Sequence, residues 1–111
     1  IGSDGLPFDP MPHPRLWGTF PRVLGHYARD LGLMSMETAI HKMTGLPARF
    51  FCIEGRGTIG EGAFADLVLI DPMRTVDQAV PSEPTAACTG VRRVWVNGKA
   101  AHSGTGRRIG R

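Results

Sequence analysis

Asp4 is the first residue of this chain whose type and setting could carry chemistry. It lies in Ile1-Gly2-Ser3-Asp4-Gly5, where one apolar residue leads into a small, turn-forming run around a single carboxylate. This pattern is typical of a buried strand that ends in a loop, which is where barrel enzymes place catalytic groups. It is equally typical of a loop aspartate that bonds its own backbone in an Asx-turn. The residues alone leave both interpretations open.

Arg15 is the second candidate, because it follows a proline-rich segment. Residues 6–18 contain four prolines, which remove backbone donors and disfavour helix in the residues before them. We therefore expect an irregular loop, and a loop of this length is typical of a lid or a binding loop. A guanidinium can hold a carboxylate through two parallel hydrogen bonds. The alternatives are a surface arginine or a pair with Asp9.

The remaining metal-ligating and nucleophilic residue types form no motif. The four histidines lack the short spacing of a zinc site, so we expect structural or surface roles for them, with His13 the exception because it shares the loop of Arg15. Cys52 and Cys88 lie far apart in sequence and are expected to be reduced thiols.

Composition limits the function classes. The chain has 111 residues with 15 glycines and 9 prolines, so its own core should be small. From Arg92 onward the sequence contains six basic residues and no acidic residue. Only Arg107, Arg108 and Arg111 cluster, so this segment does not favour nucleic-acid binding. No apolar run is long enough for a membrane span and no leader is visible, so we expect a cytoplasmic protein without membrane contact.

Two helices are expected in the first half of the chain. Thr19 is the expected cap of a helix that ends at Gly32. Ser35 is the expected cap of a second, with Met36, Ala39, Ile40 and Met43 on one side. Gly45 followed by Pro47 predicts where this helix stops.

Strands are expected in the second half. Residues 66–72 form an apolar run of strand length that ends in proline, and Asn97-Gly98 between two further runs predicts a hairpin. Helices followed by strands indicate the end of an α/β unit joined to a small β unit, with a border near residues 52–58.

Taken together, four segments resemble the carboxyl-terminal quarter of the N-acyl-D-amino-acid deacylases, or D-aminoacylases, in the amidohydrolase superfamily. The segments that carry the resemblance are Ile1 to Pro7, His13 to Phe20, Lys42 to Ala48, and Gly62 to Asp71 with Val94 to Gly98. The last of these looks like many amidohydrolases, whereas His13 to Phe20 looks like D-aminoacylases in particular.

The resemblance implies an α/β fold class. Residues 1–54 would be the end of a distorted (β/α)8 barrel, comprising the end of strand 8, the active-site loop and the closing helices. Residues 55–111 would belong to a small β-sandwich. The chain would then be a fragment that packs on the remainder of its own chain.

The resemblance also implies a reaction, the zinc-dependent hydrolysis of N-acyl-D-amino acids, which are small-molecule substrates. Asp4 would move the proton between the attacking water and the leaving nitrogen, and it is also a candidate zinc ligand. Arg15 would grip the α-carboxylate of the substrate, with His13 beside it. The family's other metal ligands are not in this chain, so the fragment alone is expected to be inactive.

Two alternatives remain. If the chain is part of an enzyme, the full-length protein could instead be a cyclic-amide hydrolase that resembles dihydroorotases or hydantoinases. If it is not part of an enzyme, the chain could be a non-catalytic module that binds a partner through an exposed surface or its basic tail.

Overall fold

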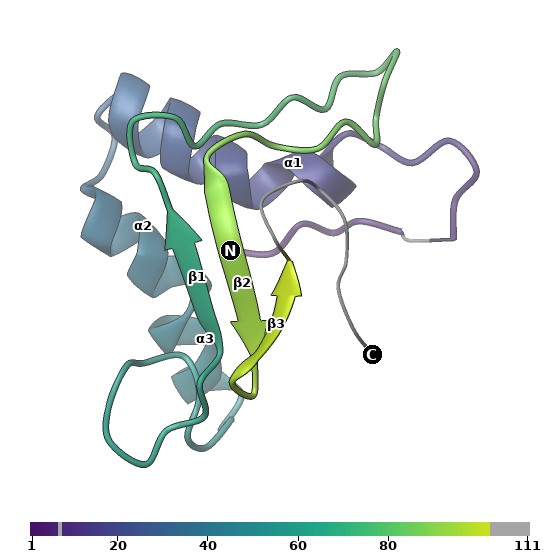
Figure 1. Ribbon diagram of the computed structural model, residues 1–111. Coiled ribbons are helices and arrows are strands. Elements are labelled where there is room, and N and C mark those ends of the chain that lie inside the picture. Colours follow the sequence, from purple (N-terminus) through teal and green to yellow (C-terminus); the bar gives the residue numbers. More distant parts are fainter. Residues whose placement is uncertain (7, 103–111) are drawn as a thin grey trace.

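The computed structural model describes residues 1–6 and 8–102, and it places helices on one side of a three-stranded sheet (Figure 1). The predicted α/β class is confirmed. The basic cluster at Arg107, Arg108 and Arg111 lies outside the described residues. Within the described part of the chain, no helix is long and apolar enough to cross a membrane. The elements in chain order are α1 (Arg15–Arg22), η1 (Val23–Asp30), α2 (Met36–Met43), α3 (Gly45–Phe50), β1 (Leu67–Ile70), β2 (Val91–Val96) and β3 (Lys99–His102).

The first helix begins at Arg15, four residues before the expected cap at Thr19. The reason lies in Pro14, whose φ of −50° and ψ of −24° already match a helix. The Thr19 hydroxyl donates to the Arg15 carbonyl over 2.7 Å, so it lies within the first turns of α1. The expectations of a loop through Gly18 and a cap at Thr19 are therefore wrong.

The same helical segment continues as η1, which has the wider turns of a π-helix. The Leu31 N–H donates to the His26 carbonyl five residues earlier, over 2.9 Å. Gly32 follows with a φ of +60°, a conformation that glycine adopts without steric cost. The predicted helix end at Gly32 is confirmed.

Ser35 caps α2 as predicted. Its side-chain oxygen accepts a hydrogen bond from the Thr38 N–H over 3.1 Å. The helix ends after Met43, but the chain then enters α3 instead of leaving the helical layer. The predicted stop of this helix at Gly45 and Pro47 is confirmed. Pro47 then lies in the first turn of α3, where a missing N–H costs nothing.

The sheet has the order β1-β2-β3, with both pairs antiparallel. Leu67 pairs with Trp95 and Val68 with Val94. Asn97 and Gly98 join β2 to β3 with φ values of 50° and 75°, as a two-residue hairpin turn requires. The predicted strand and hairpin are confirmed.

The helices and the sheet meet at a buried threonine. Thr75 is fully buried, and a side chain on Gly25 of η1 would come within 2.3 Å of its carbonyl oxygen. Arg29 donates from Nη1 to the same carbonyl over 2.9 Å and to the Pro72 carbonyl over 3.1 Å. These contacts fix the loop after β1 against η1. The buried apolar cluster nearby consists of Val23, Leu24, Ala28 and Ala39.

Candidate active site

Asp4 and Arg15 lie together in the structure. Nη2 of Arg15 is 3.0 Å from Oδ2 of Asp4, although eleven positions separate them in sequence. The Asp4 side chain is 85% exposed and that of Arg15 43% exposed, so a small ligand can reach both groups. Asp9, the alternative partner of Arg15, instead accepts a hydrogen bond from the Met11 N–H. The two predicted site residues are thus neighbours.

The backbone around Asp4 explains how the pair forms. Asp4 has a φ of 50°, in the left-handed region that aspartate tolerates better than most residues. The next residue, Gly5, packs so closely on α1 that a Cβ there would lie 2.7 Å from the Leu16 Cα. The Ser3 hydroxyl accepts the Gly5 N–H over 3.3 Å. Glycine at position 5 therefore lets the Asp4 turn rest on the first turn of α1, which begins with Arg15.

His13 has a role that the sequence did not suggest. Its Nδ1 accepts a hydrogen bond from the Arg15 N–H over 3.1 Å. The first N–H groups of a helix have no partner within the helix, so this bond satisfies one of them and fixes where α1 begins. Spacing could have indicated it, because residues two positions before a free helical N–H often supply the cap. A further role of His13 toward a substrate stays a prediction.

Metal binding and thiol reactivity are the two other chemistries that the described residues could support. No group of three or more His, Cys, Asp or Glu side chains there could hold a metal ion. Asp4 could supply one carboxylate oxygen to zinc, which takes three or four protein ligands, so the others would have to come from elsewhere. Burial raises the pKa of the half-buried Cys88 thiol, which disfavours the reactive thiolate.

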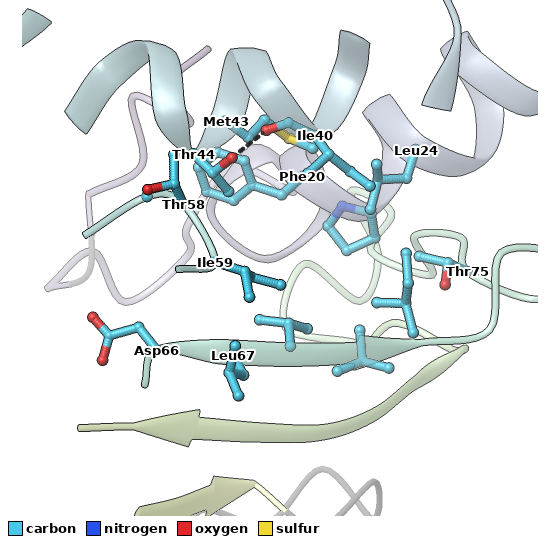
Figure 2. Close-up of a pocket in the computed structure, with 15 residues that line it drawn as sticks. Phe20, Leu24, Ile40, Met43, Thr44, Thr58, Ile59, Asp66, Leu67 and Thr75 are labelled. Atoms are coloured by element: carbon cyan, nitrogen blue, oxygen red, sulfur yellow. Dashed lines mark hydrogen bonds between the residues drawn. The ribbon is translucent and has the colours of Figure 1, made fainter. Parts of the chain in front are cut away.

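A separate apolar groove of about 580 Å³ lies between the helices and β1. Figure 2 shows Phe20, Leu24, Ile40 and Met43 on the helical side, Ile59 between the layers, and Leu67 on the strand. Asp66 lies at one end, with its carboxylate pointing away from these side chains. Asp4, His13 and Arg15 do not line this groove. The groove and the candidate active site are therefore distinct.

The Asp4 turn, the helix that follows it and the sheet also occur together in known proteins. The amidohydrolase family matches residues 1–102. This chain belongs to the amidohydrolase family. The match extends from Ile1 to the end of β3, so it includes both the candidate active site and the apolar groove of this amidohydrolase segment.

Several relatives of this amidohydrolase segment are named as D-aminoacylases or N-acyl-D-amino-acid deacylases. A D-aminoacylase from Alcaligenes xylosoxydans xylosoxydans is 61% identical over 98 residues, which is 88% of this chain and 20% of that protein. A D-aminoacylase structure described for its binuclear metal centre superimposes with a TM-score of 0.97 at 53% identity, covering 100% of this chain and 23% of that one.

A third relative was solved with ligands. It is an N-acyl-D-glutamate deacylase from Bordetella bronchiseptica, in complex with zinc and a phosphonate that mimics the tetrahedral intermediate. It matches with a TM-score of 0.89 at 51% identity, covering 91% of this chain and 21% of that one. This chain thus spans about a fifth of the length of its relatives.

Proposed function

We propose that this chain is the carboxyl-terminal part of a zinc-dependent amidohydrolase that converts N-acyl-D-amino acids to a D-amino acid and a carboxylate. The observation that carries the proposal is the approach of Arg15 to Asp4 at 3.0 Å. In an N-acyl amino acid, the scissile nitrogen and the α-carboxylate are both bonded to Cα. If Arg15 holds the α-carboxylate of the substrate, the scissile nitrogen therefore lies close to the side chain of Asp4, which is beside Arg15.

Asp4 is proposed to move the proton in this reaction. Zinc bound beside it would supply a polarised carbonyl and an acidic water. Asp4 takes a proton from the water as the new C–O bond forms, and it delivers that proton to the amide nitrogen as the C–N bond breaks. An amine leaves poorly unless it is protonated, so one carboxylate serves both steps.

Arg15 is proposed as the anchor of the α-carboxylate. Its position in the first turn of α1 is fixed by the bond of its N–H to His13, which leaves the guanidinium to bind. His13 is proposed to contribute to the same binding surface. Its Nδ1 already accepts the Arg15 N–H, so Nε2 is the nitrogen that remains for a substrate.

The proposed architecture assigns the two parts of the chain different tasks. Residues 1–54 would close a (β/α)8 barrel and bring Asp4 and Arg15 to its active-site face. Residues 55–111 would contribute strands to a small β-sandwich. The identity with D-aminoacylases supports this division, as does the change from helices to strands between α3 and β1. The other zinc ligands would come from the remainder of the longer chain.

The decisive experiment uses the full-length protein that carries this segment. We expect Asp4→Asn to lower kcat on N-acetyl-D-leucine by about 10²- to 10⁴-fold, the range for loss of a general acid or base. Asp9→Asn, on the same loop, is the matched control and should leave kcat unchanged. Near wild-type hydrolysis by Asp4→Asn would refute the assignment of Asp4.

The same preparation tests the substrate class. We expect turnover of N-acetyl-D-leucine and little turnover of its L-enantiomer, of hydantoin or of dihydroorotate. Preferential turnover of the cyclic amides would instead show that the full-length protein is a cyclic-amide hydrolase.

A further inference from the structure

We propose that Asp77 is a positioning residue for the substrate anchor, because it sets the helix that carries Arg15. The inference rests on the proposed function, in which Arg15 holds the α-carboxylate of the substrate, and deepens it. Asp77 lies in the segment between β1 and β2 and reaches α1 through Gly18 and Arg22. It would therefore act on substrate binding through the position of α1.

Asp77 contacts two successive turns of α1. Its Oδ2 accepts a hydrogen bond from Nη1 of Arg22 over 3.1 Å. One turn earlier, a Cβ on Gly18 would lie 3.2 Å from the Asp77 Cβ, so the helix backbone passes close to this side chain. The Asp77 side chain is only 10% exposed, whereas that of Arg22 is 48% exposed. A carboxylate covered to this degree needs its cationic partner, so the contact fixes the rotation of α1.

The spacing of residues in α1 puts Arg15 on the face of the helix that meets Asp77. Arg15, Gly18 and Arg22 are separated by three and four positions, and residues at this spacing share one face of an α-helix. Arg15 lies about 10 Å from Arg22 along the helix axis, at 1.5 Å per residue. A small rotation or tilt of α1 at Arg22 is therefore carried to Arg15 at the start of the helix.

The segment that contains Asp77 also holds η1, at a second point. The Gly25 backbone packs closely on Thr75, and Arg29 donates from Nη1 to the Thr75 carbonyl over 2.9 Å. These contacts do not use the Asp77 side chain, so they remain when that side chain is replaced. Loss of Asp77 then leaves η1 in place and frees the beginning of α1 to tilt.

The first test measures hydrolysis of N-acetyl-D-leucine by the full-length protein. We expect Asp77→Ala to raise KM by about three- to tenfold, because a shift of about 1 Å can cost about 10²-fold and α1 keeps its other contacts. Asp77→Asn keeps the shape of the side chain and an acceptor for Arg22, so it should raise KM less. Arg92→Ala is the matched control and should leave KM unchanged, because Arg92 lies in β2 and pairs with Asp71.

A double-mutant cycle separates positioning of the anchor from a general effect on the fold. In an Arg15→Gln background the anchor is absent, so Asp77→Ala should raise KM no further. Equal fold increases in the two backgrounds would show that Asp77 does not act through Arg15, and would overturn the proposal. An unchanged KM in the single variant would overturn it too. Thermal unfolding curves identify the folded variants, and Asp77→Asn replaces Asp77→Ala in the cycle if the latter does not fold.

The outcomes also distinguish this proposal from the proposed function. If Arg15→Gln raises KM for N-acetyl-D-leucine and Asp77→Ala does not, Arg15 is the anchor and the role of Asp77 is wrong. If the wild type does not hydrolyse N-acetyl-D-leucine, the proposed function fails. If the wild type is active and Arg15→Gln leaves KM unchanged, the role of Arg15 is wrong and the role of Asp77 with it.

Discussion

At the scale of single residues, Gly5 sets the position of Asp4, the candidate base. Asp4 reaches Arg15 because Gly5 allows the turn to rest directly on α1, with a hypothetical Cβ only 2.7 Å from the Leu16 Cα. The left-handed φ of Asp4 directs the chain into this contact. The geometry of the proposed site thus depends on the backbone of residue 5 as much as on the carboxylate beside it.

This dependence makes Gly5→Ala a sensitive test in the full-length enzyme. The added methyl would also lie 2.5 Å from the Leu16 Cδ1, so the turn and Asp4 must shift. A displacement on the order of 1 Å can cost about 10²-fold in rate, and we expect kcat/KM on N-acetyl-D-leucine to fall by about that factor.

Gly2→Ala is the control, because its Cβ would meet no atom within 4 Å. A thermal unfolding curve for each variant distinguishes a displaced site from an unfolded one. Equal activity of a folded Gly5→Ala variant and Gly2→Ala would show that Asp4 does not depend on this contact.

At the scale of elements, the hairpin is held to the loop before β1 by a set of contacts around the Asp66 carboxylate. Oδ1 of Asp66 accepts the Asn97 N–H over 2.8 Å, and its Oδ2 pairs with Arg56. Arg56 also donates from Nη2 to Oδ1 of Asn97 over 2.8 Å. Asp66 therefore connects the turn of the hairpin to the loop between α3 and β1. The hydrogen bond from Asn97 and the charge of Arg56 lower the pKa of the Asp66 carboxyl.

The lowered pKa gives a pH dependence with a definite sign. A folded-state pKa below the usual 3.8 means that Asp66 stabilises the fold above pH 3.8, and that this contribution is lost as the pH falls through the folded-state value. We expect Asp66→Asn to lower the urea midpoint at pH 7 and to lower it less at pH 3. The measurement is urea unfolding of the full-length protein, followed by the circular dichroism of its β structure. An equal loss at both pH values would contradict the electrostatic explanation.

The elements also show which features the sequence could predict. Ser35 and Asn97-Gly98 were interpreted correctly because a cap and a two-residue turn depend on a few adjacent residues. Pro14 was misinterpreted, because proline disfavours a helix before it but fits the start of one. Asp4 and Arg15 were recognisable from the sequence as candidate site residues, whose roles stay predictions. Their contact was not, since it arises from the packing of Gly5 on Leu16.

At the scale of the whole molecule, the described residues bury little apolar surface. The buried apolar residues are Val23, Leu24, Ala28, Ala39, Ala48 and Ala79, of which four are alanines. Larger apolar side chains remain exposed, among them Ile59 at 90% and Val68 at 59%. Both line the groove between the helices and β1, and Figure 2 shows Ile59 there. These exposed side chains give the groove an apolar lining that another surface or a dye can contact.

The small core and the open groove predict how the 111-residue chain behaves by itself. We expect it to bind the dye 1-anilinonaphthalene-8-sulfonate and to unfold over a broad temperature range, because a core built mainly from alanines supplies little cooperative stabilisation. Ile59→Ser should reduce dye fluorescence, since Ile59 lines the groove and is too exposed to support the fold. Phe8→Ser, at a 96% exposed side chain outside the groove, should reduce it less. Sharp unfolding without dye binding would show that the six buried residues suffice, and that the groove needs no cover.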